Sequence, residues 1–354
     1  MKKLKVGVIF GGASSEHDVS KVSGTSVISN LNKEKYEILP IYIDKKGNWY
    51  IYNKNIKDIQ ILDINSNIEQ DIKPILNIET ILKSLDVVFP VLHGLGGEDG
   101  SIQGMFQLFN VKYVGCGILA SSIGMDKAYT KIIFEKAGIK QAKYEYIRKF
   151  NDKYIYIDNE FNENILNISE VVERIDKNLK YPMFIKPSNS GSSVGINKAN
   201  NIEELKQAIE YAAKFDKKIL IEEGLIGKEV ECAVLGNEEV IASCVGEIKS
   251  AEDFYTFDAK YNNQESKVLI PAELTKEMSD RIRQLSIKAF KAIDGKGLSR
   301  VDFFANEETN EIYINEINTL PGFTTISMYP KLFEQVGLNY DKLLDKLIQL
   351  ALEK

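Results

Sequence analysis

Apolar and polar residues alternate with the period of a β-strand in two neighbouring segments in the last part of the chain. These segments, residues 299–305 and 311–317, are joined by a polar turn, a pattern typical of a β-hairpin or of adjacent antiparallel strands. Alternate side chains of a strand share a face, so Asp302 of the first segment can lie beside Glu316 and Asn318 of the second. The pattern therefore predicts that two acids and an amide meet on one face of a sheet.

Two interpretations of these acids are open. Three hard oxygen ligands at close quarters suit Mg²⁺, which takes a few protein oxygens and completes its shell with phosphate and water. The ordinary alternative is a charge pair on a wet sheet face, where Arg300 and Asp302 share a side. The turn Pro321-Gly322 comes directly after the acids and lets backbone amides approach a ligand closely, which favours the metal.

The N-terminal part begins with an apolar run at residues 5–10, a glycine-serine loop and a helical pattern at residues 18–31. This order opens a doubly wound α/β unit, in which ligands bind at the carboxyl ends of the strands. Glu16 and His17 lie at the mouth of the loop, where they either contact a ligand or cap the helix. The domain ends near Gly117, and the lack of GxGxxG argues against a dinucleotide site. Its other strands and its second helix are predicted at residues 37–43, 85–91, 112–114 and 101–110.

Two further glycine-rich loops contain or follow polar and charged residues that could bind a ligand. In HGLGGEDG, residues 93–100, the backbone can approach a ligand, and His93 is either a chemical group or a half-buried structural residue. Residues 188–195 follow the strand that contains Lys186, and their N–H groups can wrap phosphate oxygens while Lys186 supplies a cation. A plain hairpin loop is the alternative, because residues 194–197 resemble a returning strand. A hairpin that closes over phosphates as a lid would satisfy both interpretations.

The rest of the chain alternates between helical and strand patterns. Residues 150–167 are polar and predict an insertion or a surface hairpin, and residues 249–264 form a long irregular segment of the kind that serves as a lid. Helices are predicted at residues 125–139, 169–179, 201–215, 275–293 and 332–352. Strands are predicted at residues 143–147, 183–187, 218–223, 229–235 and 239–245.

Length and composition narrow the class of protein. A chain of 354 residues predicts two or three domains, and 44% hydrophobic with 27% charged residues is typical of a globular protein. We expect no membrane partner, because no run of 18 apolar residues occurs and the first apolar run is too short for a signal peptide. Three cysteines without metal spacing fit a reducing cytoplasm, and the net charge of −6 argues against nucleic acid.

Six motifs occur in an order that resembles the D-alanine–D-alanine ligases of the ATP-grasp superfamily. They are GGASSEHDVS, HGLGGEDGSIQG, MDK, KPSNSGSSVG, SRVDFF and NEINTLPGFTTISMYP. The resemblance covers the chain apart from residues 150–167. It implies an α/β protein with an N-terminal doubly wound substrate domain followed by two α+β subdomains that sandwich ATP. The three units are expected at residues 1–120, 121–217 with the Gly-Ser lid, and 218–354 with the metal site and the long lid loop.

The resemblance also implies roles for single residues. Those that would bind ATP are Lys127, Lys186, Ser192 and Ser193 at the phosphates, Glu222, Glu223 and Leu225 at the adenine, and Glu229 at the ribose. Those that would bind two Mg²⁺, or Mn²⁺ in their place, are Asp302, Glu316 and Asn318. Those that would serve the amino acids are Glu16 for the first D-alanine, Ser327 and Met328 for the second, His93 as a further substrate-binding residue, and Arg300 with the Gly322 amide for the oxyanion. Lys260 would reach the γ-phosphate, and Tyr261 would latch the lid through Ser192 to Glu16.

The activity implied is ATP-dependent joining of two D-alanines through an acyl phosphate, for peptidoglycan precursors, by a cytoplasmic homodimer. Tyr261 stands where ester-forming relatives carry a histidine, which favours an amine acceptor. Ala259 stands where D-serine-selecting relatives often carry an acid, which favours D-alanine. A D-alanine–D-serine ligase remains the alternative. A non-catalytic ATP-binding module is a second one, against which the intact set of cations and acids argues.

Overall fold

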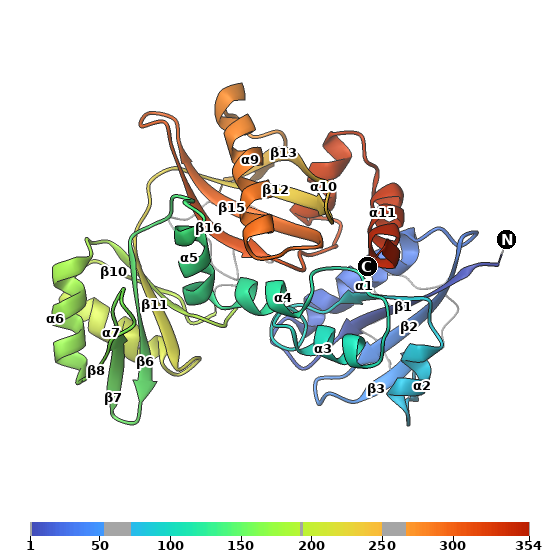
Figure 1. The fold of residues 1–354 in the computed structure, drawn as a ribbon, viewed down its shortest axis with the longest axis horizontal. Coiled ribbons are helices and arrows are strands. Elements are labelled where there is room, and N and C mark those ends of the chain that lie inside the picture. Colours follow the sequence, from blue (N-terminus) through green and yellow to red (C-terminus); the bar gives the residue numbers. More distant parts are fainter. Residues whose placement is uncertain (1, 53–71, 192–193, 250–266, 354) are drawn as a thin grey trace.

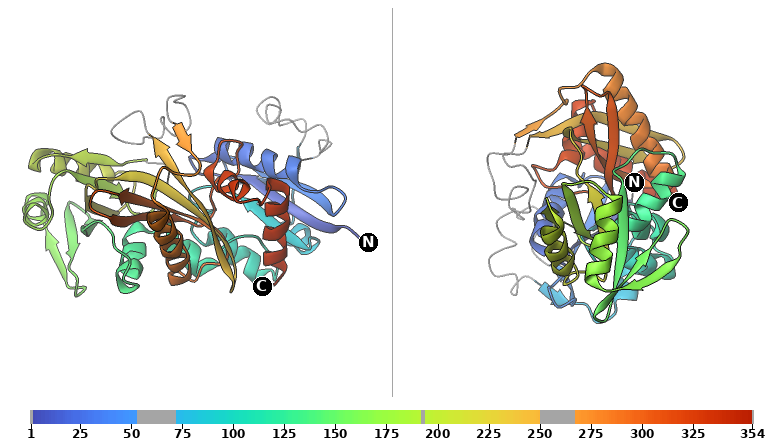
Figure 2. Two further views of the ribbon diagram at one scale, coloured as in Figure 1. Left: turned by 90° about the horizontal axis from the view of Figure 1, so that it is seen from above. Right: turned by 90° about the vertical axis from the view of Figure 1, so that its left-hand side faces the viewer.

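The computed structural model describes residues 2–52, 72–191, 194–249 and 267–353. Three β-sheets with flanking helices are present in this part of the chain. The first sheet lies at one end of the elongated molecule, the second at the other, and the third between them (Figures 1 and 2). This mixed α/β architecture confirms the predicted fold class.

The first sheet has the strand order β4-β3-β2-β1-β5, with β1 parallel to both β2 and β5 and an antiparallel extension through β3 and β4. Its central strands are almost wholly buried, as expected for a sheet covered on both faces. Its strands are β1 (Leu4–Gly11), β2 (Tyr36–Ile43), β3 (Trp49–Tyr52), β4 (Ile72–Pro74) and β5 (Val87–Val91). Its helices are α1 (His17–Asn30), α2 (Ile78–Lys83) and α3 (Ser101–Leu108).

The second sheet is antiparallel, in the order β10-β9-β11-β6-β7-β8. Its strands are β6 (Tyr144–Phe150), β7 (Lys153–Ile157), β8 (Glu163–Leu166), β9 (Met183–Pro187), β10 (Asn197–Ala199) and β11 (Lys218–Glu223). Helices α6 (Ile168–Asn178) and α7 (Ile202–Ala212) share a core with one face, through Ile147, Ile219 and Ile221. On the opposite face, Tyr146 and Leu220 pack against α5 (Lys127–Lys136), which follows α4 (Ile118–Met125).

The third sheet is also antiparallel, in the order β14-β13-β12-β15-β16. Its strands are β12 (Lys228–Gly236), β13 (Val240–Lys249), β14 (Lys267–Leu269), β15 (Gly297–Asn306) and β16 (Glu311–Asn318). The helices of this part are α9 (Lys276–Ala292), α10 (Met328–Gln335) and α11 (Tyr340–Glu353). Its hairpin β15–β16 confirms the antiparallel pair predicted from the alternating segments.

The last helices complete the core of the first sheet rather than forming a core of their own. Phe323 packs edge-on against Phe89 of β5, with ring centroids 5.7 Å apart, and the Tyr340 hydroxyl lies 3.0 Å from the Ser26 hydroxyl of α1. Leucines of α11 join the same buried cluster as Val6, Val8 and Phe10 of β1. The two ends of the chain therefore share one hydrophobic core.

Several predicted elements differ from the structure. The predicted helix at 125–139 starts only at Lys127, because Asp126 is extended and its side chain accepts a hydrogen bond from Tyr129 N as the N-cap. The predicted helix at 332–352 is two helices, since the chain turns at Gly337 with a φ of 90°. The predicted strand at 112–114 is a single bridge between Tyr113 and Val88.

Of the two alternatives for residues 150–167, the surface hairpin is correct. Strands β7 and β8 extend the second sheet, and Tyr154 and Tyr156 are buried beneath it. The returning strand expected after the Gly-Ser loop is present as β10, although it starts at Asn197 rather than at residue 194. Within the described ranges, no helix is both long and apolar enough to cross a membrane.

Candidate active site

The β15–β16 hairpin brings the predicted acids together. Asp302 pairs with Glu316 across the ladder, and Arg300 pairs with Asn318, so all four lie at the same end of the hairpin. Asp302 is buried, and both of its oxygens accept hydrogen bonds from Arg300, at 2.8 Å from Nε and 2.6 Å from Nη2. The Asn318 side-chain oxygen accepts from Leu320 N at 2.9 Å.

A second acid holds the same arginine. Glu231 lies opposite Asp302 on β12, and its Oε2 is 3.1 Å from Nε of Arg300. Burial alone would lower the pKa of Arg300, but Asp302 and Glu231 raise it well above its usual value. The guanidinium is therefore fixed between two carboxylates. Glu231 was not identified from the sequence, although its position two residues after Glu229, on the same face of a strand, could have indicated it.

The donor set at this hairpin fits a hard divalent cation. It supplies two carboxylates and one amide oxygen, the ligand type that Mg²⁺ prefers, although a cation there would have to share Asp302 with Arg300. In the described ranges, no group of three or more His, Cys, Asp or Glu side chains is arranged to hold a metal, and this set has only two acids. The assignment of Asp302, Glu316 and Asn318 to a metal stays a prediction.

The second sheet contributes a buried cluster of charges. Lys186 on β9 forms an ion pair with Glu222 on β11, and its Nζ lies 3.4 Å from the side-chain oxygen of Asn315 on β16. The other oxygen of Glu222 lies 2.8 Å from Nζ of Lys131 on α5. Although burial would raise the pKa of Glu222, the two ammonium groups lower it to about 2. Lys131 was not identified from the sequence, because this contact depends on how α5 packs on the sheet.

Lys186 also links the second sheet electrostatically to the third. Burial lowers the pKa of Lys186, but Glu222 and, with smaller effects, Glu316 and Glu229 raise it above its usual value. The predicted phosphate-binding lysine therefore lies in the field of a predicted metal ligand and of the predicted ribose-binding acid. The structure thus brings Lys186, Glu222, Glu229 and Glu316 together.

Lys127 is held against the Gly-Ser loop. Its Nζ donates to the Ser190 carbonyl oxygen at 2.6 Å, and its backbone N donates to the Ser188 oxygen at 3.0 Å. The Ser188 hydroxyl donates to Asp126 at 2.7 Å, which anchors the start of the loop to the start of α5. Ser192 and Ser193, the predicted phosphate contacts of this loop, lie outside the described residues.

Glu223 and Leu225 are the other two residues predicted to line the adenine pocket. The carboxylate of Glu223 accepts a hydrogen bond from Lys180 N at 2.9 Å, so it is turned toward the surface loop before β9. Leu225 is half-buried in the connection between the second and third sheets. Their roles at the adenine stay predictions.

Glu16 lies between the two glycine-rich loops. A Cβ atom at Gly94 would come within 2.6 Å of Oε2 of Glu16, and one at Gly191 would come within 2.9 Å of the same atom. The Gly-Ser loop therefore approaches Glu16 one residue before Ser192, which is consistent with the predicted latch. Lys260 and Tyr261, which would complete that latch and the γ-phosphate contact, lie outside the described residues.

His93 is buried next to Glu16 and Glu98. Its Nε2 lies 3.0 Å from the Ser23 hydroxyl, its Nδ1 lies 3.3 Å from the Leu320 oxygen, and Glu98 Oε1 is 3.6 Å from Nδ1. Burial lowers the pKa of His93, but the Glu98 carboxylate outweighs that effect and raises it. Burial also raises the pKa of Glu98. Glu98 was not given a role from the sequence, although it belongs to the HGLGGEDG loop.

The segment that follows the hairpin folds back on itself. A Cβ atom at Gly322 would lie 2.8 Å from the Ser327 hydroxyl, and that hydroxyl accepts from Thr324 N at 3.0 Å. The Met328 side chain is buried, with its methyl group against Gly246 of β13. Ser327 is therefore placed beside the predicted oxyanion amide, whereas the side chain of Met328 belongs to the core.

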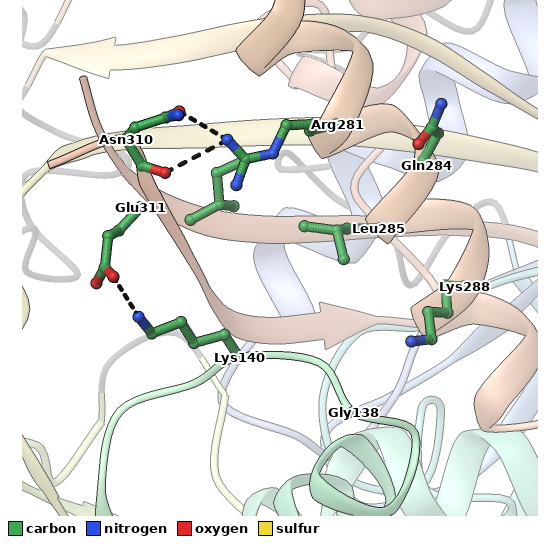
Figure 3. Close-up of a pocket in the computed structure, with 9 residues that line it drawn as sticks. Gly138, Lys140, Arg281, Gln284, Leu285, Lys288, Asn310 and Glu311 are labelled. Atoms are coloured by element: carbon green, nitrogen blue, oxygen red, sulfur yellow. Dashed lines mark hydrogen bonds and ion pairs between the residues drawn. The ribbon is translucent and has the colours of Figure 1, made fainter.

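A surface groove of about 430 Å³ lies away from all of these residues. Figure 3 shows two of its contacts, Lys140 with Glu311 at 2.5 Å and Arg281 with the side-chain oxygen of Asn310 at 2.6 Å. Its lining comes from the segment after α5, from α9, and from the β15–β16 turn with the start of β16, and it includes none of the predicted site residues. We therefore take the residues around Arg300, Lys186 and Glu16, and not this groove, as the candidate active site.

The sequence matches two family models. The model described as D-ala D-ala ligase N-terminus matches residues 5–116, and the model described as D-ala D-ala ligase C-terminus matches residues 133–349. The chain belongs to the D-alanine–D-alanine ligase family.

Relatives of this ligase family are similar over the full length of the chain. A D-alanine–D-alanine ligase of Acetivibrio thermocellus is 48% identical over 99% of this chain and 96% of its own length. The crystal structure of the VanG D-Ala:D-Ser ligase from Enterococcus faecalis superposes with a TM-score of 0.85 at 37% identity, covering 99% of this chain and 100% of that one. A D-alanine–D-alanine ligase from Bacillus anthracis, solved in complex with ATP, gives a TM-score of 0.73 at 28% identity over 99% of this chain and 98% of its own.

Proposed function

We propose that the protein is an ATP-dependent ligase that joins two D-alanines into D-alanyl-D-alanine through an acyl phosphate. The observation that carries this proposal is the contact of Lys186 with Asn315, beside Glu316. It places a buried cation of the second sheet next to the acids of the third. A polyphosphate bound between the two sheets would thus meet both a lysine and a set of metal-binding oxygens.

The first step joins two anions, because the carboxylate of one D-alanine attacks the γ-phosphorus of ATP and ADP leaves. Lys127, Lys186 and Lys260 would neutralise the phosphate oxygens, and Glu16 would bind the ammonium group of this D-alanine beside His93. Bound at Asp302, Glu316 and Asn318, two Mg²⁺ or Mn²⁺ ions would supply further positive charge to the phosphates. Glu222, Glu223, Leu225 and Glu229 would hold the nucleoside.

In the second step the amine of another D-alanine attacks the acyl phosphate, and inorganic phosphate leaves. The tetrahedral intermediate carries an oxyanion, and Arg300 with the backbone N–H of Gly322 would stabilise it. Because Asp302 and Glu231 hold the guanidinium in one position, little reorganisation is needed when that charge develops. Ser327 and the backbone of Met328 would seat the second amino acid.

An acyl phosphate hydrolyses readily, so the site must exclude water. We assign that task to the Gly-Ser loop with Ser192 and Ser193 and to the segment that contains Tyr261. The approach of Gly191 to Glu16 supports the first half of this assignment. The proposal also includes three structural units, at residues 1–120, 121–217 and 218–354. It further includes a homodimeric state and a cytoplasmic location, in which the cysteine thiols stay free.

A D-alanine–D-serine ligase is the second candidate, and the similarity to the D-Ala:D-Ser ligase of E. faecalis favours it. Mass spectrometry of the products formed from ATP, Mg²⁺ and equal D-alanine and D-serine separates the two. We expect mainly D-alanyl-D-alanine, with one phosphate released per dipeptide. Predominant D-alanyl-D-serine would establish the second candidate. Absence of any ATP-dependent dipeptide would leave only a nucleotide-binding module.

A further inference from the structure

One carboxylate in the candidate site is shared by two buried lysines. Glu222 on β11 is flanked by Lys186 from the neighbouring strand and by Lys131 from the helix that covers this face of the sheet. The side chains are only 6%, 13% and 4% exposed, respectively. None of the sequence motifs assigns a role to Lys131.

Each oxygen of the carboxylate has its own lysine. Oε1 of Glu222 contacts Lys186, whereas Oε2 lies 2.8 Å from Nζ of Lys131. Lys131 is in turn held by its surroundings. Its Nζ lies 5.4 Å from the centre of the Tyr144 ring, and its carbonyl oxygen accepts from Gln141 Nε2 at 2.8 Å. The Glu222 carboxylate and the Tyr144 ring therefore hold the Lys131 ammonium group, while Gln141 holds its backbone.

This arrangement matters when a nucleotide binds, an argument that rests on the proposed function. To contact phosphate oxygens, Lys186 must give up some or all of its pairing with Glu222. A buried carboxylate that loses its only cation is strongly destabilised. With Lys131 in place, Glu222 keeps one charge-assisted hydrogen bond, so Lys186 can transfer to the phosphate without leaving an unpaired anion.

We propose that Lys131 is a positioning residue of the nucleotide site, which holds Glu222 in place and balances its charge when Lys186 turns to the phosphates. Lys131 acts through Glu222 and touches no substrate. Its loss leaves Lys186 as the one cation that the described part of the chain places on the carboxylate. Loss of Lys131 should then weaken nucleotide binding and leave binding of the amino acids unchanged.

The test is the affinity for the non-hydrolysable ATP analogue AMPPNP with Mg²⁺, measured by calorimetry for Lys131→Met. Losing one charge-assisted hydrogen bond is expected to weaken binding on the order of tenfold. The matched control is Lys136→Met, which changes an exposed lysine of the same helix and should leave affinity unchanged. In steady-state assays, the KM for D-alanine of Lys131→Met should stay within about twofold of wild type.

A double-mutant cycle separates positioning from mere folding support. In a Glu222→Gln background, adding Lys131→Met should change AMPPNP affinity by less than about twofold, because the ion pair is already gone. Equal losses in both backgrounds would overturn the proposal, as would an unchanged affinity in the single variant. If Lys131→Met does not fold, Lys131→Gln replaces it in the same binding comparison. Glutamine is a long side chain with a hydrogen-bond donor but without the positive charge. The binding assay needs no product, so it still decides the role of Lys131 if wild type makes no dipeptide.

Discussion

Asp302 and Glu316 are paired across the β15–β16 ladder, with Arg300 bound to both oxygens of Asp302. Two acids are thereby held close together by backbone pairing, and one of them is partly balanced by a cation. Such a pair gains from a second cation, which is the physical basis for placing Mg²⁺ there.

Asp302→Asn and Glu316→Gln should each abolish dipeptide formation while the protein still folds, although Asp302→Asn should unfold at a lower temperature because Arg300 then keeps only the Glu231 carboxylate. Each change removes one negative ligand and keeps the shape of the side chain. Turnover at saturating Mg²⁺ is the measurement. Glu311→Gln is the control, since it removes an acid of the same strand that pairs with Lys140 at the surface. Near-normal turnover in either variant would exclude the metal assignment.

The two histidines of the chain should titrate on opposite sides of pH 6.5. Burial lowers the pKa of His17, whereas the Glu98 carboxylate outweighs burial and raises the pKa of His93. NMR titration of the imidazole signals resolves both. In Glu98→Gln the His93 pKa should fall while that of His17 stays, and a rise in the KM for D-alanine should accompany it. An unchanged His93 titration would show that Glu98 does not control this histidine.

Gly191→Ala should weaken binding of the first D-alanine. The added methyl group would come within 2.9 Å of Glu16 Oε2, so the carboxylate has to move. A displaced carboxylate loses part of a charge-assisted hydrogen bond to the ammonium, and we expect the KM to rise about tenfold. Gly104→Ala is the control, because the nearest atom to its Cβ, on Ile118, is 3.8 Å away. Equal KM values in the two variants would contradict the placement of Glu16.

Glu222 should make stability depend on pH under acid conditions. Its pKa falls from 4.5 to about 2 on folding, so its contribution is complete above pH 4.5 and is lost as the pH falls toward 2. The full contribution is ~3 kcal/mol. Thermal unfolding of wild type and of Glu222→Gln from pH 6 to pH 3 measures it. The advantage of wild type should shrink through this range, and a constant difference would show that the carboxylate is not held ionised by its lysines.

The apolar patterns predicted several strands of the sheets well. Strands β9 and β11 have the predicted bounds, and the β15–β16 hairpin was expected from its pattern alone. Breaks within helical patterns were missed, because the periodicity of apolar residues continues across Asp126 and Gly337 although the backbone does not. Where apolar residues recur with helical spacing on both sides, the sequence does not distinguish an aspartate that caps a helix from one that lies within a helix.

The residues of the site were identified through motifs, whereas the groups that hold them were not. Glu231, Glu98 and Lys131 each contact a predicted site residue from another strand, another loop position or another helix. Such contacts depend on register and packing, which local spacing does not determine. The matches to the two ligase family models include Glu98 and Glu231 without showing which residues they support, and Lys131 lies between the two matched ranges.

The core shared by β1 and α11 has a consequence for how the protein is made. Synthesis runs from the first sheet to the last helix, and domains generally fold as they leave the ribosome. Here the apolar face of β1 and β5 is covered by Phe323 and the leucines of α11, so it stays uncovered while the two other sheets are being made. The first sheet can therefore complete its hydrophobic core only after α11, the last helix, has been synthesised.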